Sequence, residues 1–504
     1  MKKKLTCVFA LVLAFLLLAV SSSLAETIAD VVGDSEKPVL HQLNINVKDD
    51  YNTYPTALIL EEATGYHVEY DMLPSEKAMD KLNLIMAGRE NYDIIVIGGN
   101  VDVVMGYARS GALLDLTPYL SQAPKLNAAI NDYERETFTY EGKLYAIGMQ
   151  SPAFNGRGQI NNTVFIREDY LEQLGIDMPE TLDDFVEMLR AFKEFDNGTD
   201  TPTIPLTISS GDVYLDCITG AFGIPNKWNE VDGKLVPRAE DPRTLEYLDF
   251  MKELYVEGLI DIDYPANKAS NVYEKFSTGV AACAYLSCYN YSNFGDSMKE
   301  MQPESKIAYM QPLTGPDGEC GVGVTAGGMD RIAFIPAWCQ NVEHVINYME
   351  MKLEPDTFEN VTIGQEGVHF TVDENGERWP ILPKFTQERG NSVNYYTGRP
   401  AEEYADYWKL RVKKRADIWD AWSYMNLKEP FVSKTVVSMT GYAPNFASSS
   451  YTASLSALES DMAIKIIAGE STTDDYPAFL EEWHKEGGLE LVEDYNTWWE
   501  SYNN

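Results

Sequence analysis

Residues 91–120 constrain the fold of this chain more than any other stretch of similar length. Residues 93–97 form an apolar, largely β-branched run that is typical of a strand buried on both faces, and two glycines end the run. Asn100 and Asp102 then stand where a helix would begin, and Gly111 supplies the residue that ends it. The pattern predicts a strand, a turn and a helix of an α/β layer. Ligands bind beyond the carboxyl ends of strands in such sheets, so the turn is a candidate site, although an ordinary connection fits it equally well.

Similar patterns flank this segment and predict a parallel sheet. Apolar alternation predicts strands at residues 39–47 and 68–73, and helical spacing predicts helices at residues 54–62 and 76–86, the second closed by Gly88. Together with the first segment they predict a βαβαβ unit. A second α/β unit is expected within residues 161–300, with strands at residues 163–166 and 203–208. Residues 380–450, rich in Tyr and Trp, show no clear periodicity.

Several sequence blocks resemble one family. TGYHVEYDMLPS, KLNLIMAGRENYDIIVIGG and GYARSGALLDLTPYL, in this order, resemble extracellular solute-binding proteins of the maltodextrin-binding type, which deliver sugars to membrane transporters. Further similar blocks are residues 161–189, 275–291, 363–370 and 463–488, and the last two resemble the large lipoprotein-like branch found in Gram-positive bacteria. The resemblance implies an α/β, two-lobed type II periplasmic-binding-protein fold with hinge crossovers.

The resemblance and the strand patterns together give expected domain boundaries. Lobe 1 is expected to comprise residues 39–149 with about 312–367, and lobe 2 residues 150–311 with about 368–504. The hinges are expected near residues 145–150, 309–313 and 364–370.

The amino terminus predicts secretion. Residues 1–25 combine a lysine-containing start, an apolar run and a small-residue cleavage pattern, which is typical of a signal peptide. We expect a secreted, extracellular protein that is associated with the cell surface. The cysteine nearest the signal, Cys7, precedes the apolar run, so a lipobox cysteine is absent from this segment.

The charge of the chain limits its partners. Removal of residues 1–25 would take away three lysines and no acidic residue, so the formal net charge would change from −38 to −41. Nucleic acid and anionic lipid are poor partners for such a surface. We expect a monomer whose partners are a small molecule and a membrane permease.

The cysteines do not form an obvious disulfide framework. Five cysteines follow the predicted signal peptide, at irregular spacing in a large chain, and this pattern favours buried free thiols for most of them. Cys283 and Cys288 could pair only if the chain between them bends sharply.

Motifs for catalysis and metal binding are missing from the sequence. The five histidines have no HExxH or Cys-His spacing. The sequence has no GxSxG motif, no GxxxxGKS motif and no GxGxxG motif at the start of a helix. Residues 196–200 and 373–377 are acidic, but a short turn and a hairpin explain them better than calcium sites, which need a longer loop. We therefore expect no enzyme activity, no metal and no cofactor. Two of the 78 acidic residues could still flank a glycosidic bond, so a secreted polysaccharide-active enzyme stays open as an alternative.

Aromatic residues give the main functional signal. Sugar rings stack on aromatic faces while their hydroxyl groups need polar partners, and the chain contains 31 tyrosines and 9 tryptophans. The resemblance places Tyr289 at a stacking position after a strand and Asp102 at a hydroxyl-binding position. The remaining candidates come from predicted strand-end loops. The expected ligand-binding residues are therefore Asp102, Asn100, Tyr289, Asp49, Asn52 and Trp379.

The expected function is extracellular binding of a carbohydrate and its delivery to the permease of an ABC transporter. Among carbohydrates, the favoured ligand is an oligosaccharide. A peptide or another polar solute is the alternative ligand. The two lobes would rotate about their hinges, and a ligand that contacts both would stabilise the closed form.

Overall fold

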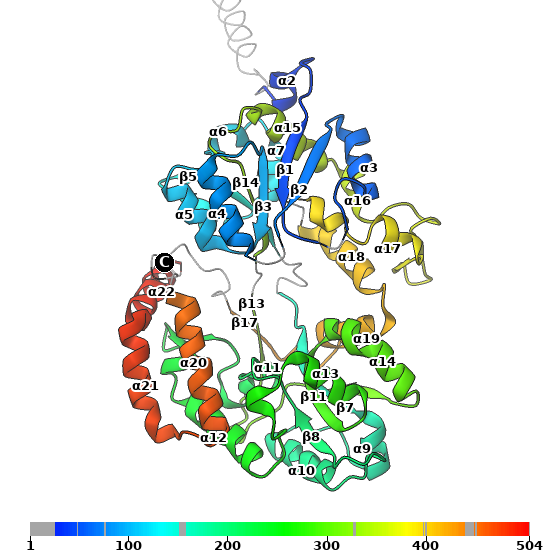
Figure 1. Ribbon diagram of the computed structural model, residues 1–504, viewed down its shortest axis with the longest axis vertical. Helices are drawn as coiled ribbons and strands as arrows, with labels where there is room; N and C mark the ends of the chain where they lie inside the picture. Colours follow the sequence, from blue (N-terminus) through cyan, green and yellow to red (C-terminus); the bar gives the residue numbers. More distant parts are fainter. Residues whose placement is uncertain are drawn as a thin grey trace, which may run out of the picture. The chain divides into compact units, whose positions relative to one another are not determined.

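The computed structural model describes residues 26–502 with short gaps. The gaps are residues 48, 75–76, 151–157, 326–328, 397, 399–400, 439–447 and 449–450, and the predicted signal peptide lies outside the described residues. The chain divides into two compact units (Figure 1). Unit 1 comprises residues 1–149, 330–370 and 383–400, and unit 2 comprises residues 150–329, 371–382 and 401–504.

Unit 1 is built on a five-stranded sheet. Its strand order is β2 (Val68–Met72), β1 (Leu40–Asn44), β3 (Ile94–Gly98), β14 (Met329–Phe334) and β6 (Ala146–Gln150). Strand β1 runs parallel to β2 and β3, whereas β14 runs antiparallel to β3. The βαβαβ unit predicted from the sequence is therefore confirmed, and β14, which arrives from a distant part of the chain, extends it.

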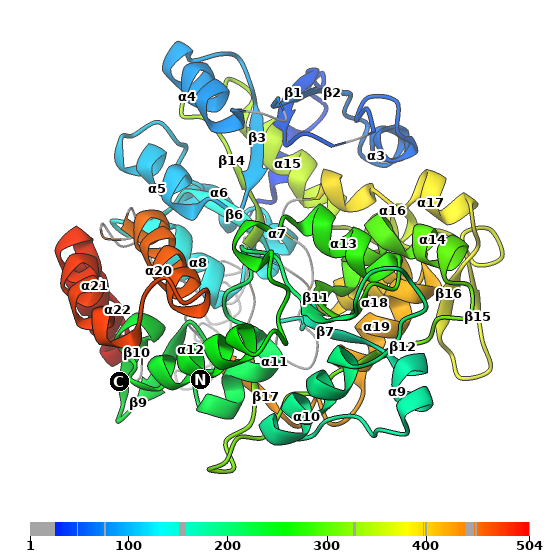
Figure 2. The ribbon, with the colours of Figure 1, turned by 60° about the horizontal axis from the view of Figure 1, so that its bottom comes forward.

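Helices cover the sheet of unit 1, and Figures 1 and 2 both show α4 and α5 next to β3. Asn100 is the residue before α5, and Gly111 after this helix has a φ of +73°. Helix α4 ends at Gly88, but Arg89 takes the left-handed conformation. The helical elements of unit 1 are α2 (Ile28–Val32), α3 (Pro55–Thr64), α4 (Ala78–Gly88), α5 (Val101–Arg109), α6 (Thr117–Leu120), α7 (Pro124–Ala129), α8 (Asp132–Phe138), α15 (Val342–Lys352), α16 (Pro355–Thr362), α17 (Lys384–Glu388) and η5 (Ser392–Tyr395), and a small hairpin joins β4 (Thr139–Tyr140) to β5 (Lys143–Leu144).

Unit 2 contains a four-stranded sheet and a larger set of helices. The strand order is β12 (Ile307–Tyr309), β7 (Asn162–Arg167), β11 (Ala281–Ser287) and β8 (Ile204–Thr207), with β11 parallel to β8 and antiparallel to β7. Its smaller strand pairs are β9 (Trp228–Val231) with β10 (Lys234–Pro237), β13 (Val322–Thr325) with β17 (Thr435–Ser438), and β15 (Phe370–Val372) with β16 (Arg378–Pro380).

The helices of unit 2 fall into two groups in Figure 2, one around the β9–β10 hairpin and one beside β7 and β11. The first group contains α12 (Arg243–Val256), α20 (Thr452–Ile467), α21 (Tyr476–Trp483) and α22 (Leu489–Tyr502). The others are α9 (Glu168–Leu174), α10 (Leu182–Lys193), α11 (Asp216–Thr219), α13 (Ala269–Ser277), α14 (Tyr291–Met301), α18 (Ala401–Val412) and α19 (Ala416–Leu427), with single turns η1 (Gly220–Phe222), η2 (Arg238–Glu240), η3 (Tyr264–Ala266), η4 (Cys288–Asn290), η8 (Thr473–Asp475) and η9 (His484–Gly488).

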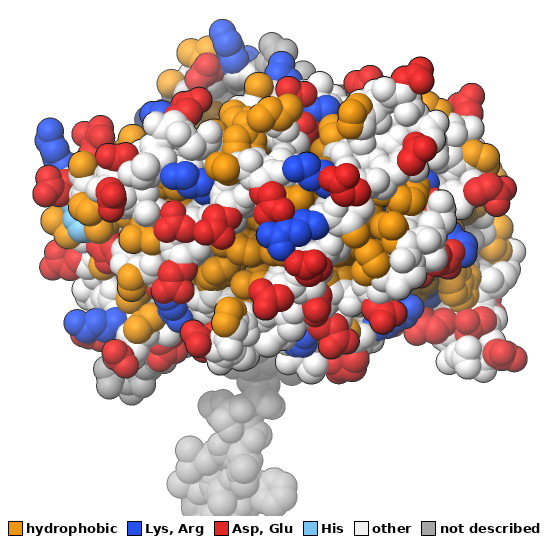
Figure 3. Space-filling view, turned by 90° about the horizontal axis from the view of Figure 1, so that it is seen from below, with side chains coloured by type: hydrophobic (Ala, Val, Ile, Leu, Met, Phe, Trp, Pro, Cys, Tyr) orange, Lys and Arg blue, Asp and Glu red, His pale blue; other side chains and the backbone are white. Residues whose placement is uncertain are grey.

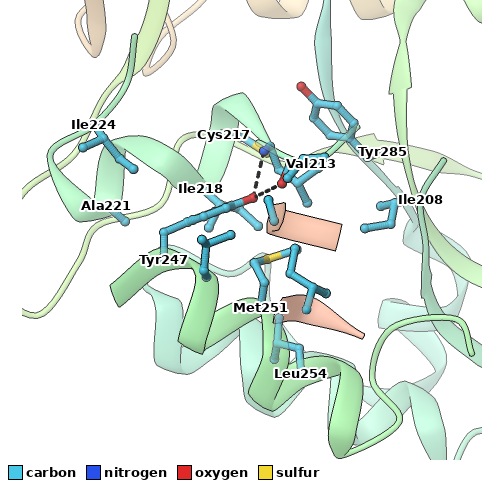
Figure 4. Packing of buried hydrophobic residues seen from close by; sticks show 14 of the residues in the cluster. Ile208, Val213, Cys217, Ile218, Ala221, Ile224, Tyr247, Met251, Leu254 and Tyr285 are labelled. Atoms are coloured by element: carbon cyan, nitrogen blue, oxygen red, sulfur yellow. Dashed lines mark hydrogen bonds between the residues drawn. The ribbon is translucent and has the colours of Figure 1, made fainter. Parts of the chain in front are cut away.

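Buried apolar side chains of unit 2 fix the loop that follows β8 (Figure 4). The hydroxyl of Tyr247, a fully buried residue of α12, donates to the carbonyl oxygen of Val213 at 2.8 Å and accepts from the backbone N–H of Leu215 at 3.0 Å. These two bonds satisfy backbone groups that burial would otherwise leave unpaired. The side chain of Tyr247 in α12 therefore fixes the loop at the carboxyl end of β8.

One expected crossover is wrong. We expected residues from about 312 onwards to belong to lobe 1, with a hinge near residues 309–313, but unit 2 continues to residue 329. The backbone N–H of Leu313 donates to the carbonyl oxygen of Cys217, and that of Thr314 donates to Glu180. Strand β13 then pairs with β17, which also belongs to unit 2. The return to unit 1 takes place within β14, because this strand pairs with β3 of unit 1.

A second difference concerns residues 383–400, which we expected in lobe 2 and which belong to unit 1. Their attachment is specific. The hydroxyl of Tyr395 donates to the carbonyl oxygen of Tyr51 at 2.7 Å, and the Lys352 ammonium donates to the carbonyl oxygen of Tyr395 at 2.9 Å. Sequence periodicity could not predict this placement, because these contacts join segments that are 344 and 43 residues apart.

The described cysteines are free thiols. Cys217, Cys283 and Cys288 are buried, and Cys320 and Cys339 are partly buried. Cys283 and Cys288 therefore do not pair in the structure. Within the described residues, no helix has the length and apolar character that crossing a membrane requires.

Candidate functional site

One edge of the unit 2 sheet brings together the elements on which ligands are expected. Ser287, at the carboxyl end of β11, pairs with Asn162, at the amino end of β7. Strand β8 runs parallel to β11, so its carboxyl end lies at the same edge. Gln159 precedes this edge and Tyr289 follows it, and both are half-buried.

Gln159 is the centre of a compact polar and aromatic group. Its Oε1 atom accepts hydrogen bonds from the indole N–H of Trp422 at 2.7 Å, the indole N–H of Trp408 at 2.8 Å and the hydroxyl of Tyr289 at 3.1 Å. The Trp408 N–H also lies 3.1 Å from the Tyr289 hydroxyl oxygen. The Tyr289 and Trp408 rings meet edge to face, with centroids 6.4 Å apart. We call these four residues the Gln159 cluster.

The chemistry of the cluster fixes the orientation of the Gln159 amide. An indole nitrogen only donates hydrogen bonds, so the amide atom that faces Trp408 and Trp422 must be the carbonyl oxygen. The amide nitrogen then points away from both tryptophans. No hydrogen bond joins Gln159 Nε2 to any residue that the structure describes, and Nε2 is not among the buried atoms that lack a partner. Gln159 therefore presents two oriented N–H donors.

Further aromatic rings extend the Gln159 cluster. Trp419 stacks on the fully buried Trp422, with ring centroids 5.6 Å apart and planes inclined by 22°. Trp379 of the β15–β16 hairpin meets Trp419 edge to face at 6.1 Å and is 38% exposed. The Lys413 ammonium lies 4.4 Å from the Trp379 ring centroid and 4.7 Å from that of Trp419, so a cation fixes both rings.

This arrangement suits a sugar. Partly exposed aromatic rings offer flat apolar surfaces to the C–H faces of a pyranose or furanose ring, and fixed amide donors offer hydrogen bonds to its hydroxyl groups. The structure brings two of the predicted residues, Tyr289 and Trp379, into one run of aromatic side chains in unit 2. Their roles as ligand contacts stay predictions.

The other predicted residues lie in unit 1. Asn100 precedes α5, and Asp102 is exposed in the first turn of that helix, where a carboxylate also stabilises the helix dipole. Asp49 accepts a hydrogen bond from the side-chain amide of Asn391.

The amide of Asn52 is used within unit 1. Its nitrogen donates to the carbonyl oxygen of Tyr70 at 2.8 Å, and its oxygen accepts from the backbone N–H of Tyr70 at 2.9 Å. This pair of bonds continues the edge of β2, so the geometry gives Asn52 a structural role.

A groove of about 720 Å³ lies at the carboxyl ends of β1 and β2 in unit 1. Asn46 and Leu73 line it from the strand ends, and Lys77, Asp80 and Lys81 line it from the start of α4. This groove occupies the position where a parallel sheet presents its ligand-binding loops.

Two carboxyl groups near the unit 2 edge have perturbed acidity. Burial, assisted by the negative charge of Asp216, raises the pKa of Asp212 to about 6. Burial also raises the pKa of Asp216, whose backbone N–H donates to the Tyr285 hydroxyl at 3.3 Å. Both residues follow β8, so a ligand at this edge would meet carboxyl groups that are more readily protonated than usual.

Among the residues that the structure describes, no group of three or more His, Cys, Asp or Glu side chains could hold a metal ion. The acidic segment at residues 196–200 is a turn, in which the Asp196 carboxylate accepts from the backbone N–H of Gly198 at 2.9 Å. Asp373 closes the β15–β16 hairpin by accepting from the backbone N–H groups of Asn375 and Glu377.

Sequence reasoning missed Gln159, Trp408 and Trp422. The tryptophans lie in residues 380–450, where helical spacing is obscured by aromatic residues on every face, and Gln159 stands outside any regular element. The density of tryptophan between residues 408 and 422 was the available signal.

Comparisons with known proteins decide the family. Residues 48–329 match the family described as bacterial extracellular solute-binding proteins. The chain belongs to this family. The solute-binding protein described here is 30% identical over 257 residues to a Niallia circulans protein described as an uncharacterized protein in the butB 5'region, and this match covers 51% of the chain and 99% of the relative. It is 26% identical over 458 residues to the polygalacturonan/rhamnogalacturonan-binding protein YtcQ of Bacillus subtilis, with 86% of each chain covered.

Solved structures confirm the fold class. The ABC-transporter substrate-binding protein FusA of Streptococcus pneumoniae, in complex with kestose, is similar with a TM-score of 0.66 and 19% identity, covering 92% of this chain and 99% of FusA. An HMO-binding, ABC-transporter-associated solute-binding protein from Bifidobacterium longum infantis is similar with a TM-score of 0.70 and 16% identity, covering 93% and 99%. The expected α/β, two-lobed type II periplasmic-binding-protein fold is thereby confirmed.

Proposed function

We propose that this solute-binding protein captures an oligosaccharide outside the cell and delivers it to the permease of an ABC transporter, without chemical change to the sugar. The observation that carries this proposal is the Gln159 cluster. It combines an oriented amide donor with partly exposed aromatic rings at the ligand-binding edge of unit 2. A peptide-binding site would instead need paired backbone donors and acceptors for an extended chain.

The relatives support the same class of ligand. YtcQ is described as a binder of polygalacturonan and rhamnogalacturonan, and a relative from Streptococcus pneumoniae, 29% identical over 218 residues and covering 40% of each chain, is described as a fructooligosaccharide ABC transporter substrate-binding protein. Sugars of such different composition share ring faces and hydroxyl groups, which are the features that an aromatic and amide site recognises.

The surface charge fits a small-molecule role. Acidic side chains are scattered over the whole face shown in Figure 3, with lysine and arginine between them. The formal net charge of −38 disfavours nucleic acid as a partner. We propose that the protein acts as a monomer, which size-exclusion chromatography with light scattering would test.

A panel of neutral and acidic oligosaccharides tests the proposal. A ligand at about 100 times its Kd stabilises the folded state by about 2.7 kcal/mol, so the melting temperature should rise visibly. Chromatography of the same mixture after overnight incubation should recover the sugar intact. Recovery of shorter products would establish an enzyme, and a rise produced only by peptides would replace the ligand class.

Secretion is part of the proposal. We expect residues 1–25 to be removed so that Glu26 becomes the first residue of the mature protein. Amino-terminal sequencing of the exported protein tests this. An intact Lys2 in the exported protein, or labelling by a palmitate analogue, would contradict it.

A further inference from the structure

Unit 1 contains a buried cation whose hydrogen-bonding capacity is not used. Arg331 of β14 is 9% exposed, and its Nε and Nη1 atoms are enclosed without a hydrogen-bond partner among the described residues. The nearest carboxylate is that of Asp330, 3.8 Å from Nε, which is beyond hydrogen-bond distance, and Asp330 is 44% exposed. A buried guanidinium that lacks partners costs free energy, so a native structure retains one only for a reason.

The register of the sheet places other unpaired groups on the same face as Arg331. Arg331 pairs with Gly98 of β3, and Gln42 of β1 pairs with Ile94 of the same strand. Registered neighbours, and residues two apart along a strand, share one face. Gln42, Asn44 and Arg331 therefore lie on one face. Asn44 is fully buried, and its Nδ2 atom lacks a partner although its oxygen accepts from Gln42 at 2.8 Å.

The position of Arg331 along the chain places it at the ligand-binding edge. Arg331 is the second residue after the chain re-enters unit 1, and Gly98 is the last residue of β3, so the pair stands at the carboxyl end of this strand. Gly98 has no side chain, and a Cβ atom built on it would meet nothing within 4 Å. The space beside Gly98 is therefore open at the position that pairs with Arg331.

A buried tyrosine lies within range of the Arg331 charge. Tyr51 is 2% exposed, and burial raises its pKa to about 12, while the positive charge of Arg331 opposes this rise. Tyr51 itself stacks on Tyr70, with ring centroids 5.7 Å apart, and Tyr70 pairs with Gln42 across the sheet. The cation thus lies in an aromatic setting of low polarity, where a pairing with an anion is strong.

We propose that the Arg331 guanidinium binds a carboxylate of the ligand at the space beside Gly98, so that the transported sugar is an acidic oligosaccharide. This inference rests on the proposed function. Guanidinium groups pair with carboxylates through charge-assisted N–H···O bonds, and the Arg331 guanidinium has donors that no described residue uses. The strongly negative net charge of the protein repels an anionic ligand at long range, so a local cation is what such a ligand requires.

The test compares trigalacturonate with its methyl ester, which has the same rings and no charge, by isothermal titration calorimetry. The wild type should bind trigalacturonate roughly 10-fold more tightly than the ester, since a hydrogen bond to a charged group exceeds one to a neutral group by about this factor. Arg331→Gln should reduce this ratio to near 1. Equal binding of acid and ester by the wild type would overturn the inference.

A second variant probes the space without touching the charge. Gly98→Val should weaken trigalacturonate binding at least 10-fold because its side chain occupies the space beside Arg331. Unchanged binding by this variant would also overturn the inference. Binding of the ester that depends on Gln159 but not on charge would uphold the proposed function alone. Binding of neither sugar, together with binding of another oligosaccharide from the panel, would overturn the inference and leave the proposed function in place. Inorganic sulfate at the same concentration identifies a general anion site, which would replace the acidic sugar if it binds as tightly.

Discussion

Replacement of Gln159 separates its two roles, because its oxygen holds three side chains and its nitrogen faces away from them. Gln159→Glu keeps an acceptor for Trp408 and Trp422 but removes both N–H donors. Affinity for the oligosaccharide found in the panel should fall by about 1–3 kcal/mol, or roughly 5- to 150-fold, because the ligand group opposite the donors loses its partner. The free energy of unfolding should change little.

Gln159→Leu removes the acceptor as well. The indole N–H of Trp422, whose side chain is fully buried, would then have no partner, and this should cost about 1–3 kcal/mol of folding stability. Trp408 and Tyr289 are half-buried, so water replaces part of what they lose. The leucine variant should therefore unfold more easily and bind weakly, whereas the glutamate variant should only bind weakly.

The measurements are calorimetric titration for affinity and urea unfolding for stability. Gln173→Glu is a matched control, since Gln173 is exposed on α9 and undergoes the same chemical change. If Gln159→Glu binds as tightly as the wild type, the amide nitrogen does not contact the ligand. If Gln159→Leu is as stable as the wild type, the three hydrogen bonds do not hold the cluster together.

Three further predictions concern single side chains. Tyr289→Ala should weaken sugar binding by about 1–3 kcal/mol in titrations, whereas Tyr289→Phe, which keeps the ring, should lose much less; a large fall in melting temperature with unchanged affinity would make Tyr289 a core residue. Burial lowers the pKa of Lys352 from 10.5 to about 7, so between these pH values the folded state binds fewer protons than the unfolded state. In urea unfolding, the free energy of unfolding of the wild type should therefore rise, relative to that of Lys352→Met, by up to about 1.4 kcal/mol per pH unit, and parallel curves for the two proteins would refute this. The pKa of Asp212 is raised to about 6, so the folded state holds a proton that the unfolded state releases, and wild-type stability should fall as the pH rises from 4 through 6. Asp212→Asn should therefore be more stable than the wild type by about 1 kcal/mol at pH 7 and equal to it near pH 4, and a constant difference across this range would exclude titration as the cause.

Much of the fold was predictable because local patterns encode it. The strand β3 and the helix α5 could be predicted from a β-branched run, an asparagine before the helix and a glycine after it, whose φ is +73°. The crossover into unit 1 was not readable. Its position depends on which distant strands accept residues 310–334, and the backbone bonds from Leu313 to Cys217 and from β14 to β3 are invisible to periodicity.

The candidate site was less predictable than the fold for the same reason. Tyr289 could be proposed from the aromatic residue that follows a strand. Its partners, Gln159, Trp408 and Trp422, come from three separate segments, and their relation depends on hydrogen bonds across 119 to 263 residues of sequence. A half-buried glutamine before a strand carries no sequence signal of its own.

In the Gln159 cluster, neighbouring side chains fix which end of a neutral amide faces the ligand. The two ends of a glutamine amide have almost the same shape, so packing alone does not decide which end faces the ligand. Two indole donors decide it, since each can only donate, and Trp422 cannot turn because it is buried and stacked on Trp419. A sugar hydroxyl both donates and accepts, so a site that presents a fixed donor selects the hydroxyl orientation that accepts. Selectivity at this position therefore depends on tryptophan N–H groups that point away from the ligand, and replacing Trp422 with phenylalanine should relax it without removing a stacking surface.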